Sequence, residues 1–234
     1  MKFTVLGCDG SYPDALGATS GYLVSGAAGK LQLDLGCGVL PRLMAQAKPE
    51  ELAALYITHW HSDHASDLLT LKYYLLIRQK QLRVYAPAET HPIRDLLEGP
   101  EFLFLDIAQA HAQGDFKVSS LKVSHPLPAH ALRIEEEGRT LVYTGDAVGG
   151  EGLAEFCSGA DLLICDATFT TAQWHSGLPH FSAAQAGQLA KEARVQQLML
   201  THAQPGSDKQ QLLKEASLEF PASLMASPGL TLLV

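Results

Sequence analysis

Long apolar runs are missing from this chain of 234 residues. No stretch approaches the roughly 20 consecutive apolar residues that a membrane-spanning helix needs. The first seven residues are typical of a strand and carry no signal-peptide pattern. We therefore expect a cytoplasmic protein without a membrane partner.

Cysteine and positive charge are also scarce. The four cysteines form no Cys-x-x-Cys pair, which predicts reduced, mostly buried thiols rather than a disulfide framework. Lys and Arg number 17 against 25 Asp and Glu, so the formal net charge is −8. An acidic surface repels phosphate backbones at long range, which argues against a general nucleic-acid-binding role.

Linkers, low-complexity segments and internal repeats are absent from the sequence, and this favours a single domain over residues 1–234. Strands mixed with helices of ten to fifteen residues predict an α/β fold built as a layered sandwich. Ser182 and Gln185 fit a capping box at the start of one of these helices. We expect strands over 2–8, 21–25, 30–35, 52–58, 82–86, 116–124, 131–135, 140–144, 161–165, 197–201 and 229–234, and helices over 39–47, 67–79, 182–194 and 207–219.

The strongest local signal is a histidine cluster, His59-Trp60-His61-Ser62-Asp63-His64. Three imidazoles and a carboxylate so close together are costly to leave unpaired. On an extended segment His59 and His61 point the same way and can bind one ion, because side chains alternate along a strand. Where the chain turns into a helix, Asp63 and His64 can face a second ion. Imidazole and carboxylate ligands suit zinc, and manganese or iron also fit.

One loop cannot complete two metal sites, since each ion needs three or four protein ligands. Three further candidates each follow a predicted strand, namely His125, Asp146 and His202. Strand ends can converge on one edge of the sheets. The sequence therefore predicts a two-metal site at that edge.

These motifs, in this order, resemble those of the metallo-β-lactamase superfamily. The resemblance rests on His-x-His-x-Asp-His at 59–64, His125, Tyr-Thr-Gly-Asp-Ala at 143–147 and Thr-His at 201–202, and it extends over essentially the whole chain. The chain is most similar to the ribonuclease Z-like branch, through Gly7, Cys-Asp-Ala-Thr-Phe at 165–169 and His-Phe-Ser at 180–182. It looks like a short bacterial hydrolase of that branch.

The resemblance implies a four-layer αββα sandwich and two divalent metal ions, zinc in the first place with Mn²⁺ or Fe²⁺ as alternatives. One ion would be bound by His59, His61 and His125, and the other by Asp63, His64 and His202, with Asp146 bridging them. Asp34 would orient the histidine loop, or would be a plain strand-end carboxylate.

Other histidines leave alternatives open. His130 competes with His125 as a ligand, and His175 lies in a loop that leads to His180. In the ribonuclease Z branch, the segment corresponding to 180–182 supplies a histidine that assists the leaving group. His180 would take that part with Asp166 orienting it, although related segments more often carry Glu; otherwise His180 only flanks a helix start.

Two departures from ribonuclease Z argue against tRNA as the substrate. His125 and Asp146 are 21 residues apart, which leaves no room for the tRNA-gripping arm of those enzymes, and the segment after His202 lacks their Ser-x-Arg-Tyr pattern. Relatives are often homodimers, and the apolar helix over 67–79 is a candidate interface or part of the core. Phe169 and Trp174 are candidates for the pocket mouth or for packing.

We therefore expect a phosphodiesterase acting on a small phosphodiester, such as a cyclic nucleotide, a cyclic phosphate or a short oligonucleotide. A hydroxide bridging the metals would attack phosphorus, with Asp63 and Asp146 positioning it. A lactone, thioester or other carboxylic ester is the alternative substrate class. A non-catalytic metal or nucleotide sensor on the same fold is a third possibility.

Overall fold

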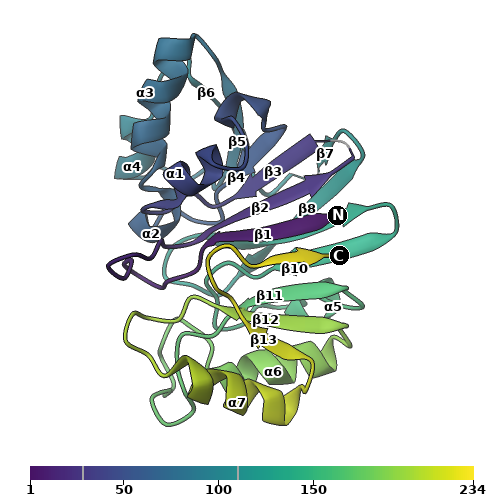
Figure 1. Ribbon diagram of the computed structural model, residues 1–234. Coiled ribbons are helices and arrows are strands. Elements are labelled where there is room, and N and C mark those ends of the chain that lie inside the picture. Colours follow the sequence, from purple (N-terminus) through teal and green to yellow (C-terminus); the bar gives the residue numbers. More distant parts are fainter. Residues whose placement is uncertain (28, 110) are drawn as a thin grey trace.

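Two seven-stranded β-sheets lie face to face at the centre of the molecule (Figure 1). The computed structural model describes residues 1–27, 29–109 and 111–234, without the side chains of residues 111 and 112. The first sheet has the order β14-β1-β2-β3-β4-β5-β6. Its strands are β1 (Lys2–Gly7), β2 (Gly21–Gly26), β3 (Gly29–Leu33), β4 (Ala54–Tyr56), β5 (Leu82–Ala86), β6 (Phe102–Asp106) and β14 (Thr231–Leu233).

The second sheet has the order β13-β12-β11-β10-β9-β8-β7. Strands β7 to β10 pair in antiparallel fashion, whereas β10 to β13 run parallel to one another. The strands are β7 (His111–Gln113), β8 (Phe116–Val123), β9 (Ala129–Glu136), β10 (Arg139–Tyr143), β11 (Leu162–Asp166), β12 (Gln197–Thr201) and β13 (Ser223–Met225).

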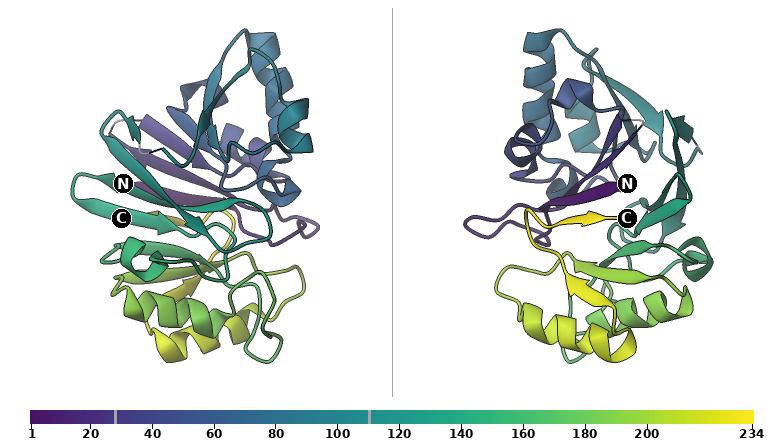
Figure 2. Two further views of the ribbon diagram at one scale, coloured as in Figure 1. Left: turned by 180° about the vertical axis from the view of Figure 1, so that it is seen from behind. Right: turned by 45° about the vertical axis from the view of Figure 1, so that its right-hand side comes forward.

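Helices cover the outer face of each sheet, as the views in Figure 2 show. The first sheet carries α1 (Val39–Met44), a short 3-10 helix η1 (Pro49–Glu51), α2 (Ser62–Ala65), α3 (Leu68–Arg78) and α4 (Pro92–Leu96). The second carries α5 (Leu153–Phe156), α6 (Ala183–Glu192) and α7 (Lys209–Glu219). Among the described residues, no helix is both long and apolar enough to cross a bilayer.

Alternating side chains along the strands build three apolar layers. In β11, Leu162 and Ile164 pack between the two sheets, whereas Leu163 and Cys165 pack against the helices of the second sheet. This is the period of two that an extended backbone imposes when both faces of a sheet are covered. The four-layer αββα sandwich expected from the sequence is therefore confirmed.

Most expected elements are present, with ends shifted by a few residues, but several short ones escaped prediction. The strand expected over 52–58 is only β4 (Ala54–Tyr56), and the helix expected over 39–47 ends at Met44. Strands β6, β7 and β13 and helices α4 and α5 were not expected. In β6 the residues Phe-Leu-Phe-Leu do not alternate, and the strand forms through parallel pairing with β5. Such pairing depends on a distant segment and leaves little local signal.

Loops at one edge of both sheets bring the polar residues together. Strands β4, β10, β11 and β12 all end at this edge, and their loops lie on the left in Figure 1. The loops that follow β4, β10 and β12 carry His59, Asp146 and His202, and Asp166 is the last residue of β11. The sheets thus present, on one side of the molecule, residues that are far apart in sequence.

Candidate metal centre

The histidine loop leaves β4 extended and then turns sharply into a short helix. His61 has the extended backbone of a helix N-cap, and α2 begins at Ser62. Asp63 and His64 therefore lie in the first turn of α2, both buried. This change from strand to helix lets one short segment present side chains in two directions.

The first cluster joins His59, His61, His125 and Asp146. Nδ1 of His61 lies 2.9 Å from Nε2 of His59 and 3.1 Å from Nε2 of His125. Oδ2 of Asp146 lies 3.6 Å from Nε2 of His59. Ring nitrogens and a carboxylate oxygen that all point at one centre form the donor set of an imidazole-bound metal ion.

The second cluster joins Asp63, His64, His202 and, again, Asp146. Nε2 of His202 lies 3.2 Å from Oδ2 of Asp63 and 3.3 Å from Oδ2 of Asp146. Nε2 of His64 lies 3.1 Å from Oδ1 of Asp146. Asp146 thus belongs to both clusters and lies between them.

The residues of both clusters fit bound cations. Nε2 of His64 and Oδ1 of Asp146 are buried without a hydrogen-bond partner, although they face each other. A buried polar atom without a partner is costly, and a cation held between these two atoms removes that cost.

Protonation also favours metal binding at the first cluster. Burial is the main cause that lowers the pKa of His59, His61 and His125, so these imidazoles are neutral near pH 7. Burial alone would raise the pKa of Asp146, but His202 and His64 hold it well below its usual range. Neutral imidazole and ionised carboxylate are the forms that bind metals.

Asp34 lies behind the second cluster at the end of β3, with φ of 51°. Its Oδ2 lies 2.7 Å from Nδ1 of His64 and accepts a hydrogen bond from the Tyr143 hydroxyl at 2.9 Å. Its Oδ1 accepts from the backbone N–H of Thr58 at 2.8 Å. A proton on Nδ1 of His64 leaves the lone pair of Nε2 facing the cluster, which is how such a carboxylate orients a ligand.

His180 and Asp166 form a pair beside both clusters. Nδ1 of His180 lies 2.7 Å from Oδ2 of Asp166, and the His180 ring stacks on His202 with centroids 4.9 Å apart. Asp166 also accepts a hydrogen bond from the backbone N–H of Ala147. Burial lowers the pKa of His180, but the charge and hydrogen bond of Asp166 outweigh it and raise this pKa to about 9.

Sequence reasoning missed three residues that hold these groups in place. Thr168 contacts Asp166 and His202, Tyr143 contacts Asp34, and the backbone N–H of Ser11 donates to Oδ2 of Asp63 at 2.8 Å. Thr168 and Tyr143 lie inside segments quoted for the family resemblance, so their positions carried a signal. Ser11, which has φ of 62° in a loop after β1, carried none.

The alternative histidines lie apart from the clusters. His130 is buried in β9, and His175 is exposed with its Nδ1 beside the carbonyl oxygen of Ser176.

The capping box at the start of α6 is confirmed, since Ser182 and Gln185 bond each other's backbone N–H.

A hollow of about 500 Å³ opens beside His125. Trp174, Leu178 and Pro126 give it apolar walls, and Phe169 does not line it. The indole N–H of Trp174 donates to the carbonyl oxygen of His180 at 3.0 Å. Nδ1 of His125 lies 3.3 Å from the carbonyl oxygen of Pro179. The loop over 174–180 therefore contacts a cluster histidine while it carries His180.

Comparison with known proteins agrees with this geometry. The model of the β-lactamase superfamily domain matches residues 36–203. The probable metallo-hydrolase YhfI of Bacillus subtilis is 32% identical, over 94% of each chain. Ribonuclease Z of Archaeoglobus fulgidus is 26% identical, over 99% of this chain and 97% of its own.

Solved structures show the same fold. The crystal structure of YhfI from Bacillus subtilis superposes with a TM-score of 0.93 at 31% identity, covering 99% of this chain and 98% of that one. The short form of human tRNase Z gives a TM-score of 0.79 at 22% identity, with coverage of 99% and 98%. Ribonuclease Z enzymes are thus among the proteins that the chain resembles, and its matched domain, its fold and its relative YhfI show that it belongs to the β-lactamase superfamily.

Proposed function

We propose that this protein is a binuclear metal-dependent phosphodiesterase that hydrolyses a small phosphodiester. The observation that carries this proposal is the His180–Asp166 pair, 2.7 Å apart, beside two clusters of metal-binding side chains. The relative named ribonuclease Z supports a phosphodiester as the reacting group.

In this proposal, His59, His61 and His125 would hold one ion and Asp63, His64 and His202 the other, with Asp146 contributing to both sites. Two bound zinc ions would lower the pKa of a water molecule and neutralise charge on the phosphoryl oxygens. The carboxylates of Asp63 and Asp146 accept hydrogen bonds from the attacking water and orient it toward phosphorus.

His180 supplies the proton that the leaving group needs. Its Nδ1 is bonded to Asp166, so its Nε2 carries the proton that can be donated. The pKa of His180, about 9, keeps the imidazole protonated at neutral pH. An alkoxide leaves poorly without a proton, so this general acid suits a phosphodiester better than a thioester, whose thiolate leaves readily without one.

The short segment between the candidate metal ligands His125 and Asp146 favours a small substrate over tRNA. Between His125 and Asp146 the structure has only the hairpin of β9 and β10. No arm extends from this interval, whose residues are all described.

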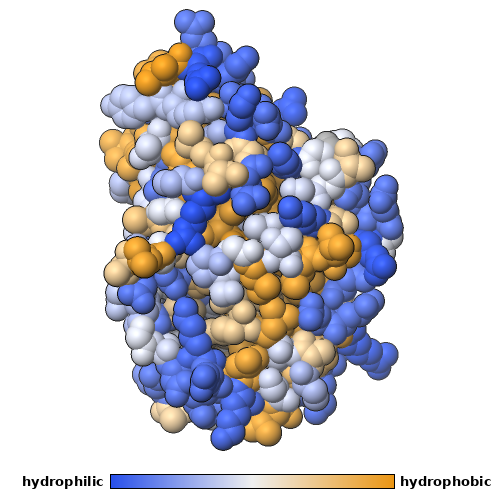
Figure 3. All heavy atoms as spheres, viewed as in Figure 1, coloured by the Kyte–Doolittle hydropathy of each residue, from blue (hydrophilic) through white to orange (hydrophobic). Residues whose placement is uncertain are grey.

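We also propose a cytoplasmic homodimer that uses α3. Four side chains of this helix form an exposed apolar stripe, Leu69, Tyr73, Leu76 and Ile77, and Ile77 is 78% exposed. Figure 3 shows hydrophobic side chains at the surface where Figure 1 places this helix. Light scattering after gel filtration should give twice the chain mass. Ile77→Glu should reduce the measured mass to that of one chain. Leu218→Glu changes an exposed leucine of α7 and should leave the mass at that of the dimer.

The main test combines metal content with substrate choice. Purified protein reconstituted with zinc should hold about two ions per chain and should hydrolyse bis(p-nitrophenyl) phosphate faster than p-nitrophenyl acetate. Two ions with ester turnover alone would move the assignment to carboxylic esters. Two ions without any turnover would favour a sensor, and fewer than one ion would overturn the ligand assignment.

A further inference from the structure

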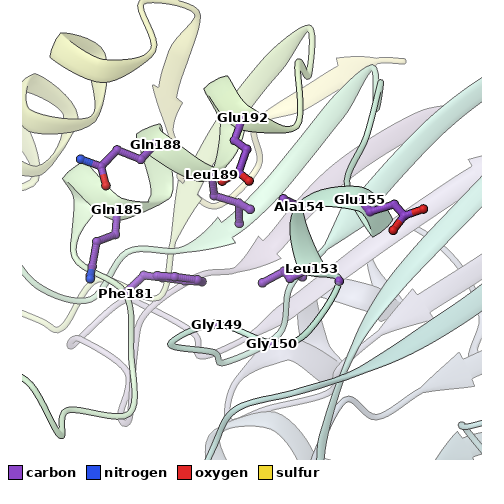
Figure 4. A pocket seen from close by; sticks show the side chains of 11 residues that line it. Gly149, Gly150, Leu153, Ala154, Glu155, Phe181, Gln185, Gln188, Leu189 and Glu192 are labelled. Carbon is purple, nitrogen blue, oxygen red and sulfur yellow. The ribbon is translucent and has the colours of Figure 1, made fainter.

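A second groove of about 540 Å³ adjoins the hollow beside His125 (Figure 4). Figure 4 shows Gln185, Gln188, Leu189 and Glu192 of α6 on one side and the segment from Gly149 to Glu155 on the other. We call this space the α6 groove; its lining includes Gly149, Leu153, Phe181, Gln185, Gln188 and Glu192.

The α6 groove adjoins the hollow beside His125. Gln185 lines both the groove and the hollow that contains His125. Ser124 and Val148 line the hollow, and the backbone N–H of Ser124 donates to the carbonyl oxygen of Gly149 in the groove at 2.9 Å. Phe181, in the groove, directly follows His180 in the chain. A substrate whose phosphate lies at the metals can therefore extend into the groove.

The lining selects for an uncharged group. Phe181, Leu153 and Leu189 are buried apolar side chains, which suit a flat ring. Gln188 brings a carboxamide that can bond the polar edge of a heterocycle, and Gln185, whose Oε1 is bonded to Ser182, can offer its amide N–H. This mixture of apolar walls and a few polar groups is typical of small-molecule sites.

Charge in the groove is of one sign. Neither the groove nor the adjoining hollow has a lysine or arginine among its described lining residues. Two exposed carboxylates border the groove: that of Glu192 lies beside Leu189, whereas that of Glu155 lies at the rim and points away from α6 (Figure 4). The nearby Arg133 is turned to the carbonyl oxygens of Phe156 and Ser158 and to Glu135. A phosphate placed in the groove would be repelled by Glu192 and, from the rim, by Glu155, and it would find no lysine or arginine among the described lining residues.

We propose, on the basis of the function proposed above, that the α6 groove binds the uncharged nucleoside or aryl part of the substrate. Glu155 and Glu192 exclude substrates that carry a second phosphate. The substrate class is thus a phosphodiester with a single negative charge, and the reacting phosphate is neutralised only at the metal centre. Longer nucleic acids are rejected by charge as well as by the lack of an arm.

Equilibrium binding tests this inference without requiring turnover. Zinc-loaded protein is titrated calorimetrically with thymidine 5′-monophosphate, thymidine 3′,5′-bisphosphate and inorganic phosphate. The double variant Glu155→Gln/Glu192→Gln should raise the affinity for the bisphosphate, relative to the monophosphate, at least fivefold. Glu98→Gln/Glu137→Gln removes the same charge from exposed positions outside the groove and should leave that ratio within twofold.

A bulky side chain tests occupancy of the groove separately. Gln188→Trp should lower the affinity for the monophosphate, relative to inorganic phosphate, at least fivefold, because the indole fills space that the nucleoside needs. The inference is overturned if neither variant changes its ratio, or if the monophosphate binds no more tightly than inorganic phosphate. Failure of the proposed function would show instead as zinc-loaded protein that leaves bis(p-nitrophenyl) phosphate intact.

Discussion

The hydroxyl oxygen of Thr168 lies 2.9 Å from Nδ1 of His202. The same oxygen lies 2.8 Å from Oδ1 of Asp166, to which it donates its proton. Nδ1–H of His202 can then donate to Thr168, which leaves the lone pair of Nε2 facing Asp63 and Asp146. One hydroxyl thus links the second cluster to the His180–Asp166 pair.

Thr168→Val should therefore weaken metal binding at the second cluster. Removing a group that orients a metal-bound histidine typically lowers metal affinity about 10- to 100-fold. Zinc affinity is measured by competition with a chromophoric chelator. Thr168→Ser keeps the hydroxyl and should stay close to wild type. Equal affinities for the valine and serine variants would show that the hydroxyl has no orienting role.

His180→Ala should reduce turnover while metal content stays at the wild-type level. A general acid contributes about 10²- to 10⁴-fold, and the loss should be larger for an alkyl leaving group than for p-nitrophenolate. The measurement is kcat for two phosphodiesters that differ only in the leaving group. His175→Ala is the matched control, since this exposed histidine lies in the same loop outside the clusters. A loss independent of the leaving group would argue against proton donation.

Asp166→Asn should shift the alkaline limb of the pH–rate profile. His180 acts in its protonated form, so activity is high below the pKa of His180, which Asp166 raises, and falls as the pH rises through that pKa. The asparagine removes the negative charge that raises this pKa, so the limb should move to lower pH by about one unit or more. Asp115→Asn, at an exposed position, should keep the wild-type limb. If the alkaline limb of the pH–rate profile stays at the same pH in Asp166→Asn, the fall in activity is due to a group other than His180.

Removal of metal should lower thermal stability strongly. A ligand present at 100 times its Kd stabilises the folded state by about 2.7 kcal/mol per site. For a chain of this size each kcal/mol shifts Tm by about 2–4 °C, so dialysis against EDTA should lower Tm by about 10 °C or more. Asp146→Ala, which loses the carboxylate common to both clusters, should melt at nearly the same temperature with and without EDTA. An EDTA effect of wild-type size in that variant would contradict the shared-ligand assignment.

The sequence predicted the layered fold because its signals are local. The strand expected over 30–35 and the capping box of α6 each rest on a pattern within a few residues, and the structure has β3 and the capped α6 at these places. Strand β6 escaped because its pairing with β5 is decided by tertiary contacts. The histidines and aspartates that cluster could be named from spacing and resemblance, and the structure places them together.

The supporting residues were harder to find. Ser11 reaches Asp63 through its backbone N–H, which any residue could supply, so its side chain gives no clue. The α6 groove combines α5, α6 and the loop after Asp146, and its negative charge exists only once these segments pack together. The contact of Ser11 with Asp63 and the charge of the α6 groove both depend on which segments meet in the folded chain, and the composition of each segment does not reveal this.

The clusters draw on both sheets. His59, His61, Asp63 and His64 follow β4 of the first sheet, whereas His125, Asp146 and His202 follow β8, β10 and β12 of the second. On the proposed ligand assignment, each ion would therefore cross-link the two sheets, because neither sheet alone supplies the full donor set of either cluster.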